Sequence, residues 1–141
     1  MKHFDSEFAA VEWNETAQAV YIMCKDKASQ HTSGYDSVIL RTDLLRSFNR
    51  AVQIAQEHRS SNLIGDISNL LILTGDDEQW SLKSLVPRLH AAGIRNMAVI
   101  PPQTLIGKLS LDLLLRRVRD IRIQRVSSVQ EAEHWLQQQR N

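Results

Sequence analysis

Short apolar runs and longer amphipathic stretches alternate along this chain, and the alternation predicts an α/β fold. The runs predict buried strands, whereas the stretches that repeat apolar residues every three or four positions predict helices. The expected strands are residues 8–15, 19–25, 38–40, 62–68, 96–100 and 121–127. The expected helices begin near residues 42, 76, 109 and 128.

The order of these elements indicates how the strands pair. Residues 8–15 and 19–25 are separated only by residues 16–18, which favours an antiparallel hairpin. The later strands are separated by helices, and such units form right-handed parallel crossovers. We therefore expect residues 1–141 to form one α/β domain, in which a mixed central sheet starts with an antiparallel hairpin, continues with parallel βα units and carries helices packed on it.

Several side chains are suited to the starts of these helices. Thr42 or Asp43 can cap the first helix, because a short side-chain oxygen accepts a bond from a first-turn amide. Ser110 is the expected cap of a helix over residues 109–119. Ser128 and Glu131 have the spacing of a capping box at the start of the last helix.

Proline and glycine predict where elements bend or end. Pro87 is expected to kink its helix and Gly93 to end it. Residues 101 and 102 are both prolines. They cannot donate backbone hydrogen bonds to a neighbouring strand and should end the preceding strand. Residues 26–37 are polar and are expected to form a loop. Gly65 interrupts a strand, where a glycine permits close packing of a neighbour.

Composition narrows the class of protein. Hydrophobic residues make up 43% and charged residues 23% of the sequence, ordinary values for a soluble globular domain. No apolar run approaches the ~20 residues of a membrane helix, and the N-terminus lacks a signal-peptide core, so a cytoplasmic protein is expected. The net charge of +1 gives no general attraction to nucleic acid. The single Cys24 is expected to be a small buried hydrophobe.

The strand at residues 62–68 marks the candidate site. Its end carries Asp66 and Ser68, and the carboxyl ends of parallel strands open onto a crevice between helices on opposite faces of the sheet. We expect Asp66, Ser68, Asp76 and Trp80 to gather there with Leu105, as a binding site for a small apolar ligand. The apolar residues 69–74 would line either this pocket or a dimer interface.

The sequence contains no recognisable catalytic arrangement. The histidines lack zinc-ligand spacing, and the acidic residues 76–78 fit a helix start better than a divalent-cation site. A glycine-rich phosphate loop is absent from the sequence. A hydrolase that uses Asp66 and a distant histidine is a third and weaker alternative, because no local nucleophile motif accompanies it. We therefore expect no enzyme activity, no metal and no cofactor.

Arginines are concentrated near the end of the chain, interleaved with leucine and isoleucine. Residues in such a pattern lie on several faces, which favours a solvated surface over a site for an acidic partner. Tryptophans are spread along the chain and are suited to the core or to an interface. The arginines are Arg116, Arg117, Arg119, Arg122 and Arg125. The tryptophans are Trp13, Trp80 and Trp135.

The assembled pattern resembles the STAS domain of anti-sigma-factor antagonists and sulphate-transporter tails. It looks most like small bacterial proteins described as STAS-like or lipid-transfer-like (CRAL-TRIO-like). The resemblance rests on VEW at residues 11–13, GDIS at 65–68, Trp80 with Pro87 and the Ala-Gly-Ile turn at 92–94, MAVIPP at 97–102 and EAEHWL at 131–136. It implies a non-enzymatic binding or regulatory domain that often self-associates.

In anti-sigma-factor antagonists, a serine of an Asp-Ser-Ser-Gly motif that follows the central strand is phosphorylated. Asp66 and Ser68 match that motif loosely, whereas its Ser-Gly continuation is missing here. Ser68 is therefore a candidate phospho-switch, with a turn or a helix cap as the alternative role.

Two functions from different classes remain. The first is a regulatory or protein-interaction module of STAS-like type, which forms a homodimer or binds a protein partner through its sheet edge or a helix face. The second is a carrier or sensor that holds a small apolar or lipid-like ligand between helices and sheet.

Overall fold

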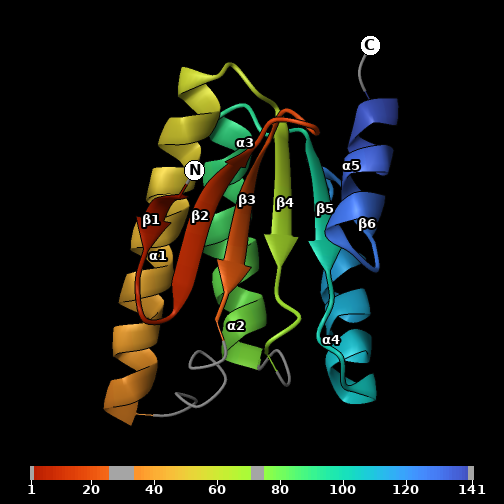
Figure 1. The fold of residues 1–141 in the computed structure, drawn as a ribbon. Coiled ribbons are helices and arrows are strands. Elements are labelled where there is room, and N and C mark those ends of the chain that lie inside the picture. Colours follow the sequence, from red (N-terminus) through yellow and green to blue (C-terminus); the bar gives the residue numbers. More distant parts are fainter. Residues whose placement is uncertain (1, 26–33, 71–74, 140–141) are drawn as a thin grey trace.

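The strands of the sheet follow one another in the order of the sequence (Figure 1). The structure, a computed structural model, describes residues 2–25, 34–70 and 75–139, and these form a six-stranded mixed sheet. β1 to β3 pair antiparallel, and β3 to β6 pair parallel. The strands are β1 (Lys2–Asp5), β2 (Ala9–Asn14), β3 (Ala19–Cys24), β4 (Asn62–Asp66), β5 (Asn96–Ile100) and β6 (Arg122–Arg125).

The predicted fold class is therefore confirmed, including the hairpin of β2 and β3. β1 is an edge strand that the sequence pattern does not predict, because its four residues, KHFD, contain a single apolar side chain.

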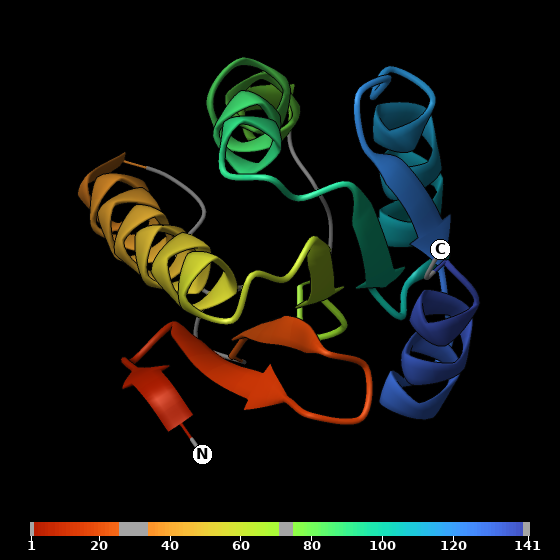
Figure 2. The ribbon, with the colours of Figure 1, turned by 90° about the horizontal axis from the view of Figure 1, so that it is seen from above.

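The helices form two layers, one on each face of the sheet (Figure 2). α1, the segment from α2 to α3, and α4 each connect one parallel strand to its next neighbour, always in the same direction along the sheet. Right-handed crossovers in one direction place their helices on one face, and α5 lies on the other face. The helices are α1 (Gly34–Glu57), α2 (Gly75–Trp80), the π-helical turn η2 (Ser81–Leu85), α3 (Val86–Ala91), α4 (Leu105–Leu115) and α5 (Val129–Gln138).

This arrangement corrects one expectation. The loops after β4 and β5 were expected to lead into helices on opposite faces, but the strand order does not reverse between β3 and β6. A crevice of that kind forms at a reversal of strand order, so that basis for the candidate site is wrong.

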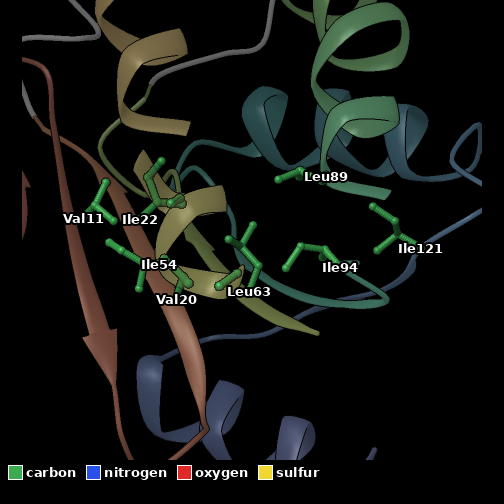
Figure 3. Packing of buried hydrophobic residues seen from close by; sticks show 10 residues of the cluster. Val11, Val20, Ile22, Ile54, Leu63, Leu89, Ile94 and Ile121 are labelled. Carbon is green, nitrogen blue, oxygen red and sulfur yellow. The ribbon is translucent and has the colours of Figure 1, made fainter. Parts of the chain in front are cut away.

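A hydrophobic core fills the space between the sheet and α1 to α3 (Figure 3). Alternation along the strands places Val20, Ile22 and Leu63 on this face, where they pack with Ile54 of α1 and Leu89 of α3. Each large side chain buried in this way contributes about 1.5–3 kcal/mol of hydrophobic free energy.

A second core lies between the sheet and α5. Ile64, Ala98 and Ile100 come from β4 and β5, and Ala132 and Leu136 come from α5. The alanines allow the helix and the sheet to approach closely.

Gly65 of β4 allows Met97 of β5 to pack against its backbone. A Cβ atom at position 65 would lie 3.0 Å from Cε of Met97. The expectation of close packing at this glycine is confirmed.

α1 begins well before the predicted start near residue 42. The predicted strand at 38–40 is wrong, because these residues are helical, and so is the cap at Thr42 or Asp43, because both lie inside α1. A run of three apolar residues is too short for its periodicity to distinguish a strand from a helix. The side chain of Asp43 instead accepts a hydrogen bond from the hydroxyl of Ser6. Of the loop expected at 26–37, residues 34–37 are helical and 26–33 lie outside the described residues.

α4 also begins earlier than predicted. Thr104 caps it, with Oγ1 accepting a hydrogen bond from the amide of Gly107 at 3.0 Å, so the predicted cap at Ser110 is wrong. Ser110 lies inside the helix, where its hydroxyl donates to the carbonyl of Gly107 at 2.9 Å. The earlier start matters because it adds Leu105 and Ile106 to the helix.

The other helix ends follow the sequence. Pro87 lies just after the π-helical turn, in which the amide of Val86 donates to the carbonyl of Ser81. Gly93 follows α3 with φ = 101°, a left-handed conformation that glycine adopts without strain. Ser128 caps α5 by accepting from the amide of Glu131 at 3.1 Å, and Glu131 accepts from the amide of Ser127.

Candidate functional site

A buried carboxylate, Asp66, organises the polar side chains at the carboxyl end of β4. Tyr21 Oη donates to Asp66 Oδ2 at 2.7 Å. The amide and the hydroxyl of Ser68 donate to Oδ1 at 3.0 Å and 2.6 Å. Asp66 is only 8% exposed, and hydrogen-bonded partners are what make such burial affordable for a carboxylate.

The register of the strands explains why these groups meet. Met23 of β3 lies opposite Asp66, and Tyr21 lies two residues earlier on the same side of β3. This is the face that α5 covers further along the sheet, since Tyr21 packs against the core that contains Ile64 and Leu136. The long phenol ring can therefore reach the end of β4, while Asp66 folds back on Ser68 in a turn that suits this pair.

Burial, and then the hydrogen bond to Asp66, raise the pKa of Tyr21 well above its usual value near 10. The phenol stays protonated at neutral pH and donates its proton to the carboxylate. Because the pKa is raised, Tyr21 is a weak acid at neutral pH. Its hydrogen bond to Asp66 instead helps to fix the turn after β4.

Ser68 is the candidate phospho-switch, and its hydroxyl is already engaged by Asp66. A phosphoryl group on Ser68 would break this hydrogen bond and bring two negative groups together. The switch stays a prediction, with disruption of the turn as its expected effect.

The other predicted site residues lie on α2 and α4. Asp76 is exposed in the first turn of α2. The ring of Trp80 packs edge-on against Phe48 of α1, with centroids 6.1 Å apart, on the face of the sheet opposite to Asp66. Leu105 is 75% exposed at the start of α4. The structure thus joins Asp66 and Ser68, and their shared role with Asp76, Trp80 and Leu105 stays a prediction.

The apolar connection at residues 69–74 is described only at its start. Leu70 packs against Phe8 and Cys24 with Ile67. Cys24 is buried, as expected. Residues 71–74 lie outside the described part of the chain. Whether residues 69–74 line a pocket or a dimer interface therefore stays a prediction.

The outer face of α4 is the feature that the sequence interpretation missed. Among the described side chains, the exposed large hydrophobic ones are Leu105 at 75%, Ile106 at 61%, Leu109 at 54% and Leu113 at 58%. We call these four residues the leucine stripe. Leu111 and Leu114 are buried on the inner side, as predicted. The sequence LIGKLSLDLLL has apolar residues on the outer as well as the inner side of the helix, and one inward face cannot account for all of them.

Two arginines of the predicted cluster tie β6 to its neighbours. Arg125 Nη1 contacts both carboxylate oxygens of Asp112 in α4, at 3.0 Å and 2.9 Å. Arg122 Nη1 donates to Gln139 Oε1, just after α5, at 2.6 Å. Arg116, Arg117 and Arg119 are exposed at the carboxyl end of α4.

A second group that the sequence does not predict lies at the opposite end of the sheet. The rings of Trp13 and His58 stack with centroids 3.8 Å apart and planes inclined by 9°. Trp13 Nε1 donates to Glu15 Oε2 at 2.6 Å. This indole N–H, and then Gln18, hold the pKa of Glu15 below its usual value. Trp13 and His58 are too far apart in sequence for a local motif to reveal the stack.

The described residues contain no cluster of histidine, cysteine, aspartate and glutamate that could hold a metal ion. No helix in the described ranges is both long enough and apolar enough to cross a membrane.

Comparison with protein-family models, with curated proteins and with solved structures finds no match to this chain. The resemblance to STAS-like proteins therefore stays an inference from short motifs.

Proposed function

We propose that this protein is a non-enzymatic, STAS-like interaction module that self-associates as a homodimer through α4. The observation that carries the proposal is the leucine stripe. Its members are more than half exposed on one helix, and a contiguous apolar surface of this kind typically marks a binding surface.

The stripe forms one continuous ridge. Leu105, Leu109 and Leu113 are spaced four residues apart, and residues three or four apart are neighbours on a helix surface. Ile106 widens the ridge beside Leu109. The buried Leu111 and Leu114 hold the inner side of α4 in the protein, so covering the ridge does not require the helix to turn.

The energetics fit a reversible dimer. Covering each exposed side chain would gain roughly 1–2 kcal/mol, from the about 1.5–3 kcal/mol of full burial. Over two copies this gives roughly 8–16 kcal/mol, which is comparable to the ~4–15 kcal/mol that association costs. The stripe alone therefore roughly offsets the cost of association, and a micromolar dissociation constant, which corresponds to about 8 kcal/mol, requires further contacts around the stripe.

The charges favour the helix face over the β6 edge of the sheet as the interface. β6 is an edge strand with exposed side chains at Arg122 and Arg125. Pairing two β6 edges would bring arginines of the two copies close together, and such like charges oppose edge-to-edge pairing.

The deciding experiment compares two matched lysine substitutions by light scattering from low to high micromolar concentration. Leu109→Lys places a charge in the middle of the stripe and should leave the protein monomeric. Gln56→Lys changes an exposed residue of α1 and should dimerise like the wild type. Both keep residues with good helix propensity.

A wild-type protein that is monomeric throughout this range would refute self-association. Thermal shift measurements would then test the alternative function, a carrier of a small apolar ligand. A melting temperature that rises with the concentration of a fatty acid would favour a small apolar ligand.

A further inference from the structure

The leucine stripe has a centre, and the charges beside it are not symmetric about that centre. Leu109 lies midway between Leu105 and Leu113. Arg116 and Arg117 are exposed beyond the carboxyl end of the stripe, and the exposed Lys108 and half-buried Asp112 lie along one flank. This asymmetry favours one orientation of a second copy.

We propose that two copies pack their α4 helices antiparallel, about a two-fold axis that passes beside Leu109. This inference rests on the proposed self-association and adds its geometry. In an isologous contact, residue i of one copy meets residue j of the other and the reverse. Leu109 then meets the partner's Leu109, and Leu105 meets the partner's Leu113.

The arginines argue against the parallel alternative. A parallel pair would place Arg116 and Arg117 of both copies at the same end of the interface, where like charges repel. In the antiparallel pair each Arg116 lies about 10 Å from the axis, at 1.5 Å per residue, so the two are about 20 Å apart. That separation exceeds the screening length of about 8–10 Å in physiological salt.

The flank beside the stripe adds an attraction. Lys108 and Asp112 are four residues apart and lie on the same side of Leu109. A two-fold axis perpendicular to the helices keeps this flank on the same side in both copies. Lys108 therefore comes within one helical turn of the partner's Asp112, and this attractive contact occurs twice, whereas the repulsive approach of the two Lys108 side chains occurs once. Asp112 is held in place by Arg125, and a carboxylate can accept from more than one cation.

Single-cysteine substitutions test the register, because a disulfide needs Cα atoms about 4–7 Å apart. Leu109→Cys lies on the axis and should cross-link to itself under mild oxidation. Leu113→Cys should not, since its two copies would be about 12 Å apart along the helices. A mixture of Leu105→Cys and Leu113→Cys proteins should give the mixed dimer. Non-reducing electrophoresis measures the yields, with at least a tenfold excess expected for Leu109→Cys over Leu113→Cys.

The outcomes separate this geometry from the function on which it rests. Self-cross-linking of Leu113→Cys as strongly as Leu109→Cys would indicate parallel helices and overturn the proposal, while self-association would stand. A dimeric wild type in which none of these cysteines cross-links would also overturn it, because the interface would then lie elsewhere. A monomeric wild type would refute both. The native Cys24 is buried and is present in every sample, so wild-type protein gives the background.

A charge substitution gives an independent reading. Lys108→Glu should raise the dimer dissociation constant about fivefold, because it puts a second carboxylate beside the partner's Asp112 at two places. In a parallel pair the Lys108 flank of one copy faces the opposite flank of the other, so the substitution would leave the dissociation constant unchanged or lower it. Sedimentation at two salt concentrations measures the effect, which should shrink at high salt.

Discussion

Tyr21 donates a hydrogen bond to Asp66 across 45 residues of sequence, with 2.7 Å between Oη and Oδ2. This contact joins β3 to the end of β4 and completes the set of donors around a buried carboxylate. A hydrogen bond to a charged group contributes about 1.5–3 kcal/mol, so one phenol hydroxyl has a large part in the order of this turn.

Removing that hydroxyl should destabilise the protein. Tyr21→Phe keeps the ring and leaves Asp66 buried with one donor fewer, so we expect the free energy of unfolding to fall by about 1–3 kcal/mol. Ser68→Ala removes a hydroxyl donor and keeps the amide donor, and should cost about 0.5–1.5 kcal/mol. Urea denaturation measures both. A change below about 0.5 kcal/mol for Tyr21→Phe would contradict this role of the hydrogen bond.

The raised pKa of Tyr21 predicts a loss of stability in alkali. The unfolded chain releases the phenol proton near pH 10, whereas the folded protein retains it to higher pH. The stabilisation is therefore complete below about pH 10 and declines as the pH rises through the folded pKa. Melting temperatures of the wild type and Tyr21→Phe should converge above pH 10. The absorbance of the Tyr21 phenolate, measured as the difference between the wild type and the variant, should appear only above the pH at which an ordinary tyrosine ionises.

Adjacent leucines of α4 provide a matched test of the orientation of the helix. Leu114 is 7% exposed and Leu113 is 58% exposed. Leu114→Ala should cost about 2–4 kcal/mol through a cavity, whereas Leu113→Ala should change the stability of the monomer by less than about 0.5 kcal/mol. The two substitutions alter helix propensity equally. Similar losses, measured by denaturation at concentrations below the dimer range, would contradict the described orientation.

Gly65→Ala should reveal its contact with Met97. The added Cβ would lie 3.0 Å from Cε of Met97, so the methionine has to move, at a cost of about 1 kcal/mol. In a Met97→Ala background the same substitution should cost less. The double-mutant cycle measures this coupling, and equal costs in both backgrounds would show that the contact does not limit position 65.

The start of α4 can be tested through its cap. Thr104→Ala removes the acceptor of the Gly107 amide and should cost about 1 kcal/mol. Ser110 lies inside the helix, where alanine is the better helix former. Ser110→Ala should therefore lower the free energy of unfolding by less than about 0.5 kcal/mol. The reverse order in thermal denaturation would favour a helix that begins at Ser110.

β4 and β5 were predictable because strands buried on both faces read as nearly continuous apolar runs. NLIGD and NMAVI are buried on both faces or nearly so, and both became strands. The starts of α1 and α4 were not predictable in the same way. Thr104 and Ser110 both carry a hydroxyl that could cap a helix, and the sequence alone does not decide between them.

For the candidate site, sequence reasoning found only what lies close together in the chain. Asp66 and Ser68 are two residues apart, and they do interact. Tyr21 reaches Asp66 through the register of β3 on β4, and Trp80 packs on the other face because successive crossovers advance in one direction. Both facts belong to topology, which single-sequence patterns do not specify.

The position of α5 in the chain has a consequence for synthesis. Every strand in the described residues precedes α5, and α5 covers the apolar face formed by Ile64, Ala98 and Ile100. As the chain leaves the ribosome, that face stays uncovered until Leu136 has emerged and docked. Nascent chains with exposed apolar sheet surface are prone to aggregate or to bind chaperones. A stalled or truncated chain that ends before residue 129 should therefore accumulate in the insoluble fraction even though its sheet is complete.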